Sequence, residues 1–204
     1  MNKGKTNKLI CIVGMCGAGK SEVSDYLLKK REFGYIRFGQ ITIDKIIEMG
    51  AKPSEELERQ IREGFRRDYG MAAFAILNMP KIDKLIGQGD LIADGLYSWE
   101  EYLELKKKYP DSLIVIAVYA PPSLRYQRLV GRSDKHKDDH EKKFRSFTED
   151  EAKSRDQAEI ENSHKAGPIS MADFTLINTG PIENLHRQID SVVAEIYDNF
   201  SKHN

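Results

Sequence analysis

The sequence predicts an α/β fold in which a parallel β-sheet is flanked by helices. Short apolar runs alternate with helix-like stretches along the chain. Several of these runs are apolar throughout, which is typical of strands buried on both faces in a parallel sheet. A chain of 204 residues suffices for one substantial core. We therefore expect residues 1–204 to form a single domain with a small insertion.

The elements are expected in the following order. Strands are predicted at residues 9–14, 35–38, 90–94, 112–120 and 174–178. Helices are predicted at 19–31, near 40–50, from 54, around 71–87 with a bend at Pro80, from 98, after 121, from 148, and from 182 to about 200. Capping-box patterns mark two helix starts, at Ser98 with Glu101 and at Thr148 with Glu151. Residues 131–147 are almost entirely polar, so they are expected to form a mobile surface loop.

Composition limits the classes of partner. Lysine and arginine total 32, as do aspartate and glutamate, so no overall field favours nucleic acid or an anionic membrane. The apolar run at 9–14 is far shorter than the ~20 residues of a membrane span. The two cysteines, Cys11 and Cys16, are too few for a disulfide framework and fit a reducing compartment. We expect a cytoplasmic monomer or homodimer that binds neither nucleic acid nor membrane.

A glycine-rich segment joins the first strand to the first helix. Gly14, four further residues and then Gly19, Lys20 and Ser21 complete the pattern G-x-x-x-x-G-K-[ST]. Glycines let backbone N–H groups turn toward an anion, and the helix N-terminus adds positive partial charge. In such a loop the lysine reaches the terminal phosphates of a nucleoside triphosphate and the hydroxyl binds Mg2+. A glycine-rich turn in an unrelated α/β protein is the alternative, but the flanking strand and helix favour the phosphate loop.

The loop predicts ATP and Mg2+ as cofactors. The residues expected to contact them are Gly14, Met15, Cys16, Gly17, Ala18, Gly19, Lys20, Ser21 and Glu22. Asp94, followed by Gly95, ends the third predicted strand, where open α/β sheets place their ligands. Asp94 is therefore a second candidate for holding Mg2+, through water. A helix-cap or turn aspartate is the alternative.

Arginines flank the polar segment on both sides. Arg125, Arg128 and Arg132 are spaced by three and four residues, so they share one side of a helix, and Arg155 lies on the next helix. Guanidinium groups on a closing flap would stabilise the charge of a phosphoryl group in transfer and exclude water. Exposed ion pairs with Glu149, Glu151 and Asp156 are the alternative, more so for Arg125 and Arg155 than for Arg128 and Arg132.

Other nucleotide-binding classes lack support in the sequence. It contains neither an N-K-x-D motif that reads guanine nor a D-x-x-G switch after the third strand, and it is short for a motor ATPase. The phosphate loop, "ADG", "RLVGR", "SRD" and "ADFTLINTG", taken in this order, resemble the nucleoside monophosphate kinase and dephospho-coenzyme A kinase superfamily over residues 9–195. The chain looks most similar to the adenylate-kinase-related, archaeal-type P-loop proteins.

The resemblance implies a three-layer P-loop NTPase fold. Its five-stranded parallel sheet would have the order 2-3-1-4-5, with helices on both faces. The core would comprise about 9–38, 89–131 and 148–200, with an acceptor-binding helical insertion at about 39–88 and a lid at about 132–147. By the same resemblance Arg128 would lie against adenine, Arg132 and Arg155 would contact the phosphates, and Asn178, Thr179 and Gly180 would border the base. The expected catalytic set is then Lys20, Asp94, Arg128, Arg132 and Arg155.

The acceptor side departs from the family pattern. In "FGQITID", Gln40 replaces the usual aspartate and Ile43 the usual arginine, and "LYS" at 96–98 replaces a second acceptor arginine. An acceptor phosphate needs cations, whereas an acceptor hydroxyl needs a carboxylate base, for which Asp44 and Asp94 are candidates. The candidate acceptor residues are Arg37, Gly39, Gln40, Asp44, Arg62, Arg66, Gly95 and Tyr97. Arg62, Arg66 and the neighbouring Arg67 fit the solvated face of a helix equally well.

Three functions remain open at this point. The first is a kinase that transfers phosphate from ATP to a small phosphorylated acceptor, with a nucleoside monophosphate as the leading candidate and dephospho-coenzyme A as the closest rival. The second is an ATP-binding regulatory protein without catalysis, suggested by the altered acceptor segments. The third, an ATPase acting on nucleic acid, is disfavoured by the balanced charge and by the lack of an aromatic and basic platform. The sequence favours the kinase.

Overall fold

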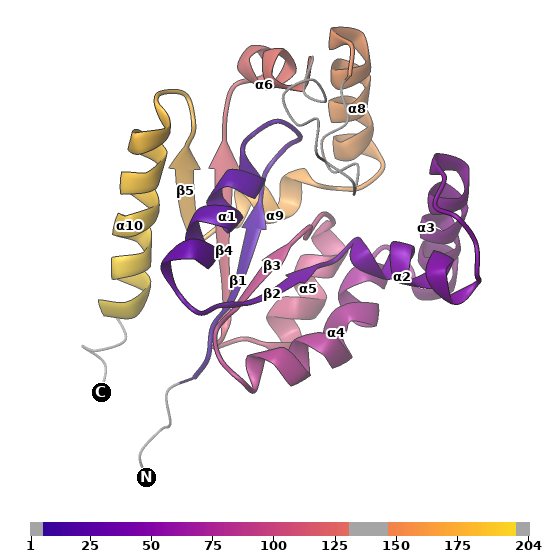
Figure 1. Ribbon diagram of the computed structural model, residues 1–204, viewed down its shortest axis with the longest axis horizontal. Coiled ribbons are helices and arrows are strands. Elements are labelled where there is room, and N and C mark those ends of the chain that lie inside the picture. The colour runs from indigo at the N-terminus through magenta and orange to yellow at the C-terminus, as the bar shows by residue number, and fades with distance from the viewer. Residues whose placement is uncertain (1–5, 131–146, 199–204) are drawn as a thin grey trace.

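The sheet of the computed structural model, which describes residues 6–130 and 147–198, agrees with the predicted topology. Within these residues the strands are β1 (Leu9–Val13), β2 (Gly34–Arg37), β3 (Leu91–Asp94), β4 (Leu113–Tyr119) and β5 (Phe174–Ile177). They form one parallel sheet of order β2-β3-β1-β4-β5 (Figure 1). Both the predicted strands and the predicted order are confirmed.

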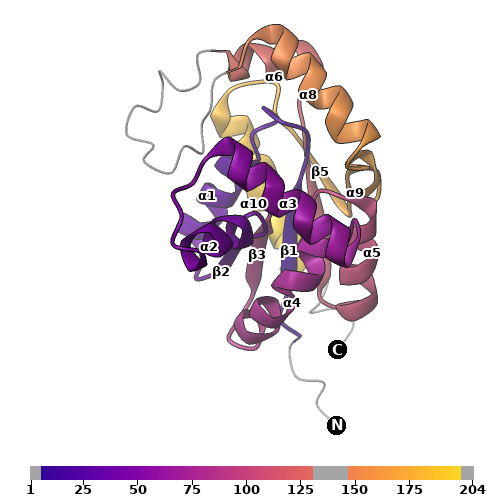
Figure 2. The ribbon, with the colours of Figure 1, turned by 90° about the vertical axis from the view of Figure 1, so that its right-hand side faces the viewer.

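Helices cover both faces of the sheet (Figures 1 and 2). Within the described residues they are α1 (Lys20–Lys30), α2 (Gln40–Glu48), α3 (Glu55–Tyr69), α4 (Ala73–Ile86), α5 (Trp99–Lys108), α6 (Pro122–Leu129), α8 (Glu149–Glu161), α9 (Ala166–Ser170) and α10 (Ile182–Asp198). Helices α1 and α10 pack on one face, while α4 and α5, with the short α9, cover the other. The sequence analysis did not predict α9.

The alternation of side chains along β1 explains why this strand is apolar throughout. Leu9, Cys11 and Val13 point into the core beneath α4 and α5, whereas Ile10 and Ile12 point into the core beneath α1 and α10. Each of these five side chains is at most 1% exposed. A strand buried on both faces has no solvent side that needs polar residues, so the run is continuous.

Both predicted capping boxes are present. The Ser98 hydroxyl accepts a hydrogen bond from the Glu101 backbone N–H at 3.0 Å, and the Glu101 carboxylate accepts one from the Ser98 N–H at 3.3 Å. Thr148 and Glu151 form the same pair of bonds at the start of α8. Glu101 is also 1% exposed, and burial raises the pKa of its carboxyl to about 7.

Helices α2, α3 and α4 form the excursion between β2 and β3. Helix α3 lies at the rim of the molecule, farthest from the sheet in Figure 1, and α4 runs through Pro80 to pack on the core. Buried Asn78 ties α4 to the end of β2, since its side-chain amide donates to the Phe38 carbonyl at 3.1 Å. The predicted lid at 132–147, which includes Arg132, lies outside the described residues except for Phe147. None of the helices in residues 6–130 and 147–198 is long and apolar enough to cross a membrane.

Candidate active site

The phosphate loop adopts a backbone that only glycine tolerates well. Gly14, Gly17 and Gly19 have φ angles of 144°, 80° and 106°, in a region that L side chains rarely adopt. A Cβ atom on Gly14 would lie 2.5 Å from the Val118 carbonyl oxygen, and one on Gly19 would collide with the side-chain amide of Asn178. The loop is therefore held against the ends of β4 and β5, and its glycines are required by geometry.

Helix α1 begins at Lys20 without a side-chain cap at Gly19, so its first N–H groups are open to an anion. The Lys20 ammonium arches back over the loop and donates to the carbonyls of Gly14 at 2.9 Å and Met15 at 3.2 Å. The Ser21 hydroxyl, half-buried in the first turn, has no hydrogen-bond partner within the described residues. This arrangement leaves a helix terminus, an ammonium group and a hydroxyl available to a phosphate chain.

Arg125 supports the phosphate loop and is not a free cation of the α6 surface. The alternative of an ion pair with the following helix holds for it, but the pair is buried. Arg125 is 4% exposed, and its guanidinium bonds both carboxylate oxygens of Asp156 on α8, one at 2.8 Å. The same Nη1 donates to the carbonyl of Cys16 in the loop at 3.1 Å. Arg125 thus joins α6 to both α8 and the phosphate loop. Arg125 is therefore neutralised and positions the loop.

Arg128 and Asn178 meet at the other side of the loop. Arg128 Nη2 donates to the Asn178 carbonyl at 2.9 Å, and the Asn178 amide donates to the Ala18 carbonyl at 2.8 Å. Asn178 follows β5, and the exposed Thr179 and Gly180 continue from it. The structure thus brings together the residues for which the resemblance implied an adenine site, although their contact with adenine stays a prediction.

Asp94 ends the strand next to β1. In the register of the sheet it lies beside Ile12 of β1 and Arg37 of β2, and the chain then turns at Gly95, whose φ is 99°. Within the described residues its carboxylate accepts a hydrogen bond from the Tyr35 hydroxyl, at a long 3.5 Å. The half-buried carboxylate therefore has acceptor capacity left for a ligand.

The donor set of Ser21 and Asp94 fits Mg2+. Hydroxyl and carboxylate oxygens are the hard ligands that this ion prefers, and it usually completes its shell with water and substrate phosphates. Within residues 6–130 and 147–198, no cluster of three or more histidine, cysteine or acidic side chains is suited to hold a metal alone. A Mg2+ ion here would consequently depend on the nucleotide for part of its coordination.

A second set of cations faces the loop from α8 and from the segment that leads into α9. Arg155 Nε donates to Glu159 Oε1 at 3.0 Å, and the Lys165 ammonium donates to Glu159 Oε2 at 2.5 Å. Lys165 is 2% exposed, and its Nζ lies 4.5 Å from the centre of the Tyr97 ring. Sequence analysis missed Lys165 and Glu159, because Lys165 stands in "NSHKAGPIS", which matches no motif and had no predicted element.

The first group of candidate acceptor residues lies at the start of the α2–α4 excursion. Arg37 is the last residue of β2, half-buried beside Asp94, and Gly39 caps α2. The Gln40 side-chain amide donates to Asp44 Oδ1 at 3.0 Å on the exposed side of α2. Asp44 is exposed on α2, whereas Asp94 lies at the end of β3, next to the strand that leads into the phosphate loop.

The arginines of α3 divide into two kinds. Arg62 and Arg67 form ion pairs with Glu58 and Asp68, at 3.3 and 3.2 Å, as expected for a solvated face. Arg66 instead lies over the Phe74 ring of α4 at 5.9 Å, and its buried Nε has no hydrogen-bond partner within the described part of the chain. Arg66 is therefore the inward-facing cation of the excursion.

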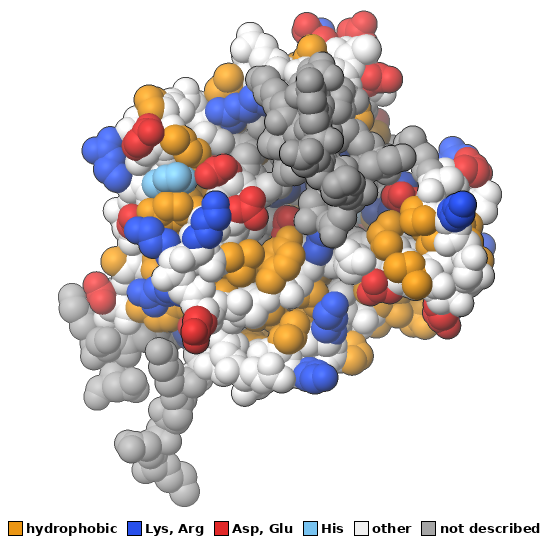
Figure 3. Space-filling view, viewed as in Figure 1, with side chains coloured by type: hydrophobic (Ala, Val, Ile, Leu, Met, Phe, Trp, Pro, Cys, Tyr) orange, Lys and Arg blue, Asp and Glu red, His pale blue; other side chains and the backbone are white. Residues whose placement is uncertain are grey.

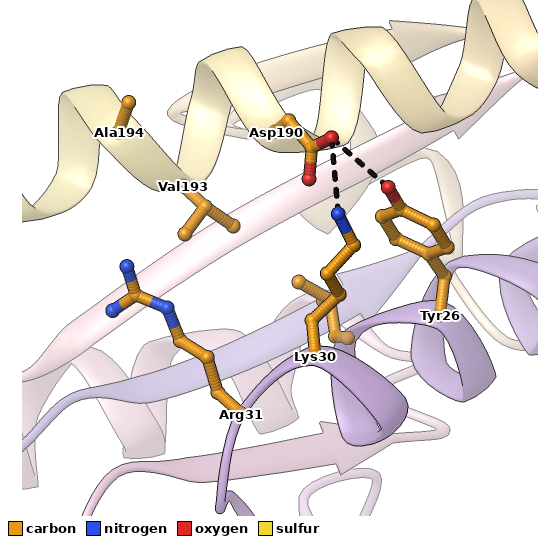
Figure 4. Close-up of a pocket in the computed structure, with 7 residues that line it drawn as sticks. Tyr26, Lys30, Arg31, Asp190, Val193 and Ala194 are labelled. Atoms are coloured by element: carbon orange, nitrogen blue, oxygen red, sulfur yellow. Dashed lines mark hydrogen bonds and ion pairs between the residues drawn. The ribbon is translucent and has the colours of Figure 1, made fainter.

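One cavity of about 210 Å³ lies elsewhere, between α1 and α10 (Figure 4). Two of its charged groups are paired with each other, since Asp190 accepts from the Tyr26 hydroxyl at 2.9 Å and contacts Lys30 at 3.5 Å, and Arg31 lies over the Tyr197 ring at 4.3 Å. Lys30 ends α1, whereas the phosphate loop precedes its first residue, so the helix separates the two by about 15 Å. This cavity is a feature of helix packing and is not part of the candidate site.

Comparison with known proteins agrees with this geometry. A family model described as an AAA domain, AAA_18, matches residues 10–159. A UPF0200 protein from Sulfurisphaera tokodaii is 33% identical over 190 residues, covering 93% of this chain and 97% of that protein. The chain is an AAA-domain protein of the UPF0200 family. In this chain the region that matches the AAA-domain model extends from β1 into α8, so it includes the phosphate loop, Asp94 and Arg155.

Solved structures of small-molecule kinases share the fold. A gluconokinase from Sinorhizobium meliloti 1021 superposes with a TM-score of 0.58 at 13% identity, covering 98% of each chain. A shikimate kinase from Acinetobacter baumannii gives a TM-score of 0.54 at 15% identity, covering 96% of each chain. At such low identity the likeness shows the fold alone. This chain therefore has a P-loop kinase-like fold.

Proposed function

We propose that this protein transfers the terminal phosphate of Mg-ATP to a small-molecule acceptor. The observation that carries the proposal is the convergence of Lys20 and Ser21, at the start of α1, with Asp94 at the end of the neighbouring strand. Arg155 reaches the same region from α8. Phosphoryl transfer depends on positioning and charge stabilisation, which this set of groups can supply.

Each residue has a distinct part in the proposed reaction. The open N–H groups of the loop and Lys20 bind the phosphate chain, and Arg128 with Asn178 borders the base. Ser21 and Asp94 hold Mg2+, which when bound offsets the negative charge of the phosphates. Arg155, with Arg132 from the segment outside the described residues, stabilises the charge on the phosphoryl group in transfer.

A phosphorylated acceptor is our first choice, and a nucleoside monophosphate is the leading candidate. Arg37 lies beside Asp94 and Arg66 turns its buried Nε inward, and cations in these places favour an anionic acceptor. The alternatives are acceptors that offer a hydroxyl group. They are dephospho-coenzyme A and the hydroxy acids gluconate and shikimate, which the names of the structural neighbours suggest. For a hydroxyl acceptor a carboxylate must take the proton as the new P–O bond forms and ADP leaves. Asp94 is better placed for this than exposed Asp44.

A coupled ADP-release assay tests the proposal. Mg-ATP is supplied with nucleoside and deoxynucleoside monophosphates, dephospho-coenzyme A, gluconate and shikimate in turn. One acceptor is expected to stimulate release, and Lys20→Ala and Arg132→Ala are each expected to lower turnover at least about 100-fold. Lys106→Ala, at the exposed end of α5, is the matched lysine control and should not change turnover.

Two outcomes would contradict the proposal. Undiminished turnover by Lys20→Ala would show that the loop is not the site of transfer. ATP binding without stimulation by any acceptor would instead favour a regulatory ATP-binding protein. A nucleic-acid ATPase has less support, because positive and negative side chains are interspersed on the face shown in Figure 3.

A further inference from the structure

Lys165 is a buried ammonium group next to the phosphate loop. Its side chain is 3% exposed and donates one hydrogen bond, to Glu159 Oε2. An ammonium group carries three donors, so two remain without a partner in the described residues. Burial and the positive charge of nearby Lys20 lower the pKa of Lys165 to about 8. Lys165 therefore stands close enough to Lys20 for the two charges to repel each other.

Charge around this lysine is not balanced. Within the described residues, Lys165 and Arg155 both form their ion pair with the same carboxylate, that of Glu159. Arg125, the other nearby guanidinium, is already neutralised by Asp156. Lys20, Arg155 and Lys165 thus carry three positive charges, against two negative charges on Glu159 and Asp94.

Tyr97 lies near most of these groups. Burial raises the pKa of its hydroxyl, and the charges of Asp94 and Glu159 raise it further, while Arg155 acts in the opposite direction. The Lys165 ammonium lies over the same ring. The end of β3, helix α8 and the segment before α9 therefore meet around Tyr97, next to the loop.

A buried lysine that shares its one carboxylate partner with an arginine gives the fold no evident advantage over an apolar residue. An apolar side chain of similar length would fill the space without the cost of desolvating an ammonium group. The surplus positive charge and the free donors are instead suited to an anion. Because Lys20 belongs to the phosphate loop, the anion nearest to both lysines is the end of the phosphate chain.

We propose that Lys165 is a second lysine of the phosphate site, which binds the terminal phosphate of a nucleoside triphosphate together with Lys20, while Glu159 is its positioning residue. This inference rests on the proposed function, since it requires a nucleotide in the loop. It assigns to Lys165 a contribution to the preference for the triphosphate over the diphosphate.

The test is equilibrium binding by calorimetry at pH 7 with Mg2+, using ADP and a non-hydrolysable ATP analogue. Lys165→Met is expected to weaken binding of the analogue about tenfold or more and that of ADP less than about threefold, since a charge-assisted bond to the third phosphate is lost. The exposed Lys153→Met on α8 is the control and should change neither affinity. An unchanged ratio of the two affinities in Lys165→Met would overturn the inference.

If Lys165→Met does not fold, the pH dependence of nucleotide binding by the wild type tests the inference instead. Between pH 7 and pH 9.5 the preference for the triphosphate analogue should fall by up to about tenfold per pH unit above pH 8, as Lys165 loses its proton. The titratable and charged groups that face Lys165 are Lys20, Cys16, Tyr97, Arg155 and Glu159. Any of them that also changes binding to the loop changes the affinity for ADP, so the ADP affinity at each pH serves as the reference. A preference that stays flat over this range contradicts the inference.

Failure of the proposed function gives a different result. If the wild type binds neither nucleotide, or if Lys20→Ala binds both as the wild type does, the phosphate loop is not a nucleotide site. If the wild type binds both and Lys165→Met keeps the same preference, the nucleotide site stands and the role of Lys165 is refuted.

Discussion

Breaking the ion pair between Arg125 and Asp156 should destabilise the protein strongly. Arg125→Met leaves the Asp156 carboxylate, whose side chain is 10% exposed, with the Tyr126 hydroxyl at 3.1 Å as its remaining partner in the described residues. Removing one member of a buried pair costs about 3–5 kcal/mol, because the other charge stays buried. For a chain of this length each kcal/mol lowers the melting temperature by about 2–4 °C, so we expect a loss of about 6–20 °C.

A double-mutant cycle separates the pair from its surroundings. Urea unfolding is measured for Arg125→Met, Asp156→Leu and the double variant, with nucleotide affinity as the second readout. The double variant should lose clearly less than the sum of the two single losses, since no unpaired charge remains. Nucleotide affinity should fall in both variants that lack Arg125, because its bond to the Cys16 carbonyl is lost.

Arg59→Met provides the control, because Arg59 forms an exposed ion pair with Glu56. It should cost less than about 1 kcal/mol. The reasoning would be refuted if Arg125→Met cost no more than this control, or if the two single effects simply added.

Three further changes test other parts of the structure. Gly14→Ala places a Cβ 2.5 Å from the Val118 carbonyl oxygen. It should lower the free energy of unfolding, measured with urea, by about 1–3 kcal/mol and weaken nucleotide binding. Gly89→Ala, at a position with open space around it, is the control and should do neither. Asp94→Asn should lower phosphotransfer at least about 100-fold but leave Mg2+-free ADP affinity within about threefold, and equal turnover would exclude Asp94 from the site. Folding raises the pKa of Glu101 from 4.5 to about 7, so its contribution to stability is fully present below pH 4.5 and is lost as the pH rises through about 7. The stability of the wild type relative to Glu101→Gln should therefore fall by about 3 kcal/mol over this range, and a constant difference would contradict the assignment.

Local patterns carried much of the information about this fold. The apolar runs predicted each strand to within two residues. In β1 the run is continuous, because burial on both faces leaves no alternation of apolar and polar side chains. Ser98 and Thr148 marked two helix starts, since a cap depends on residues only three apart. The phosphate loop was likewise identified from Gly14 to Ser21, where eight consecutive residues form the binding unit. The strand order, by contrast, followed from the family resemblance.

The candidate site was predicted only where a motif existed. Lys20, Ser21 and Asp94 could be named because a loop pattern or a strand end pointed to them. Arg128 and Asn178 came from the resemblance, and the structure brings them together at 2.9 Å. The predicted contacts of these side chains with ligands, and the role of Arg132 in particular, stay predictions that the assays above test.

The sequence by itself determined the strands, the phosphate loop and the cations available to it, because these depend on spacing along the chain. Only the tertiary structure decided which cations are free. Arg125 is 31 positions from Asp156, and packing of α6 against α8 turns a seemingly exposed arginine into a buried ion pair. Lys165 is 68 positions from Tyr97, and only the meeting of α8, α9 and the end of β3 places its ammonium over the Tyr97 ring, within the electrostatic influence of Lys20. Such contacts join segments that are distant in sequence, and desolvation then sets which charges stay available to a phosphate.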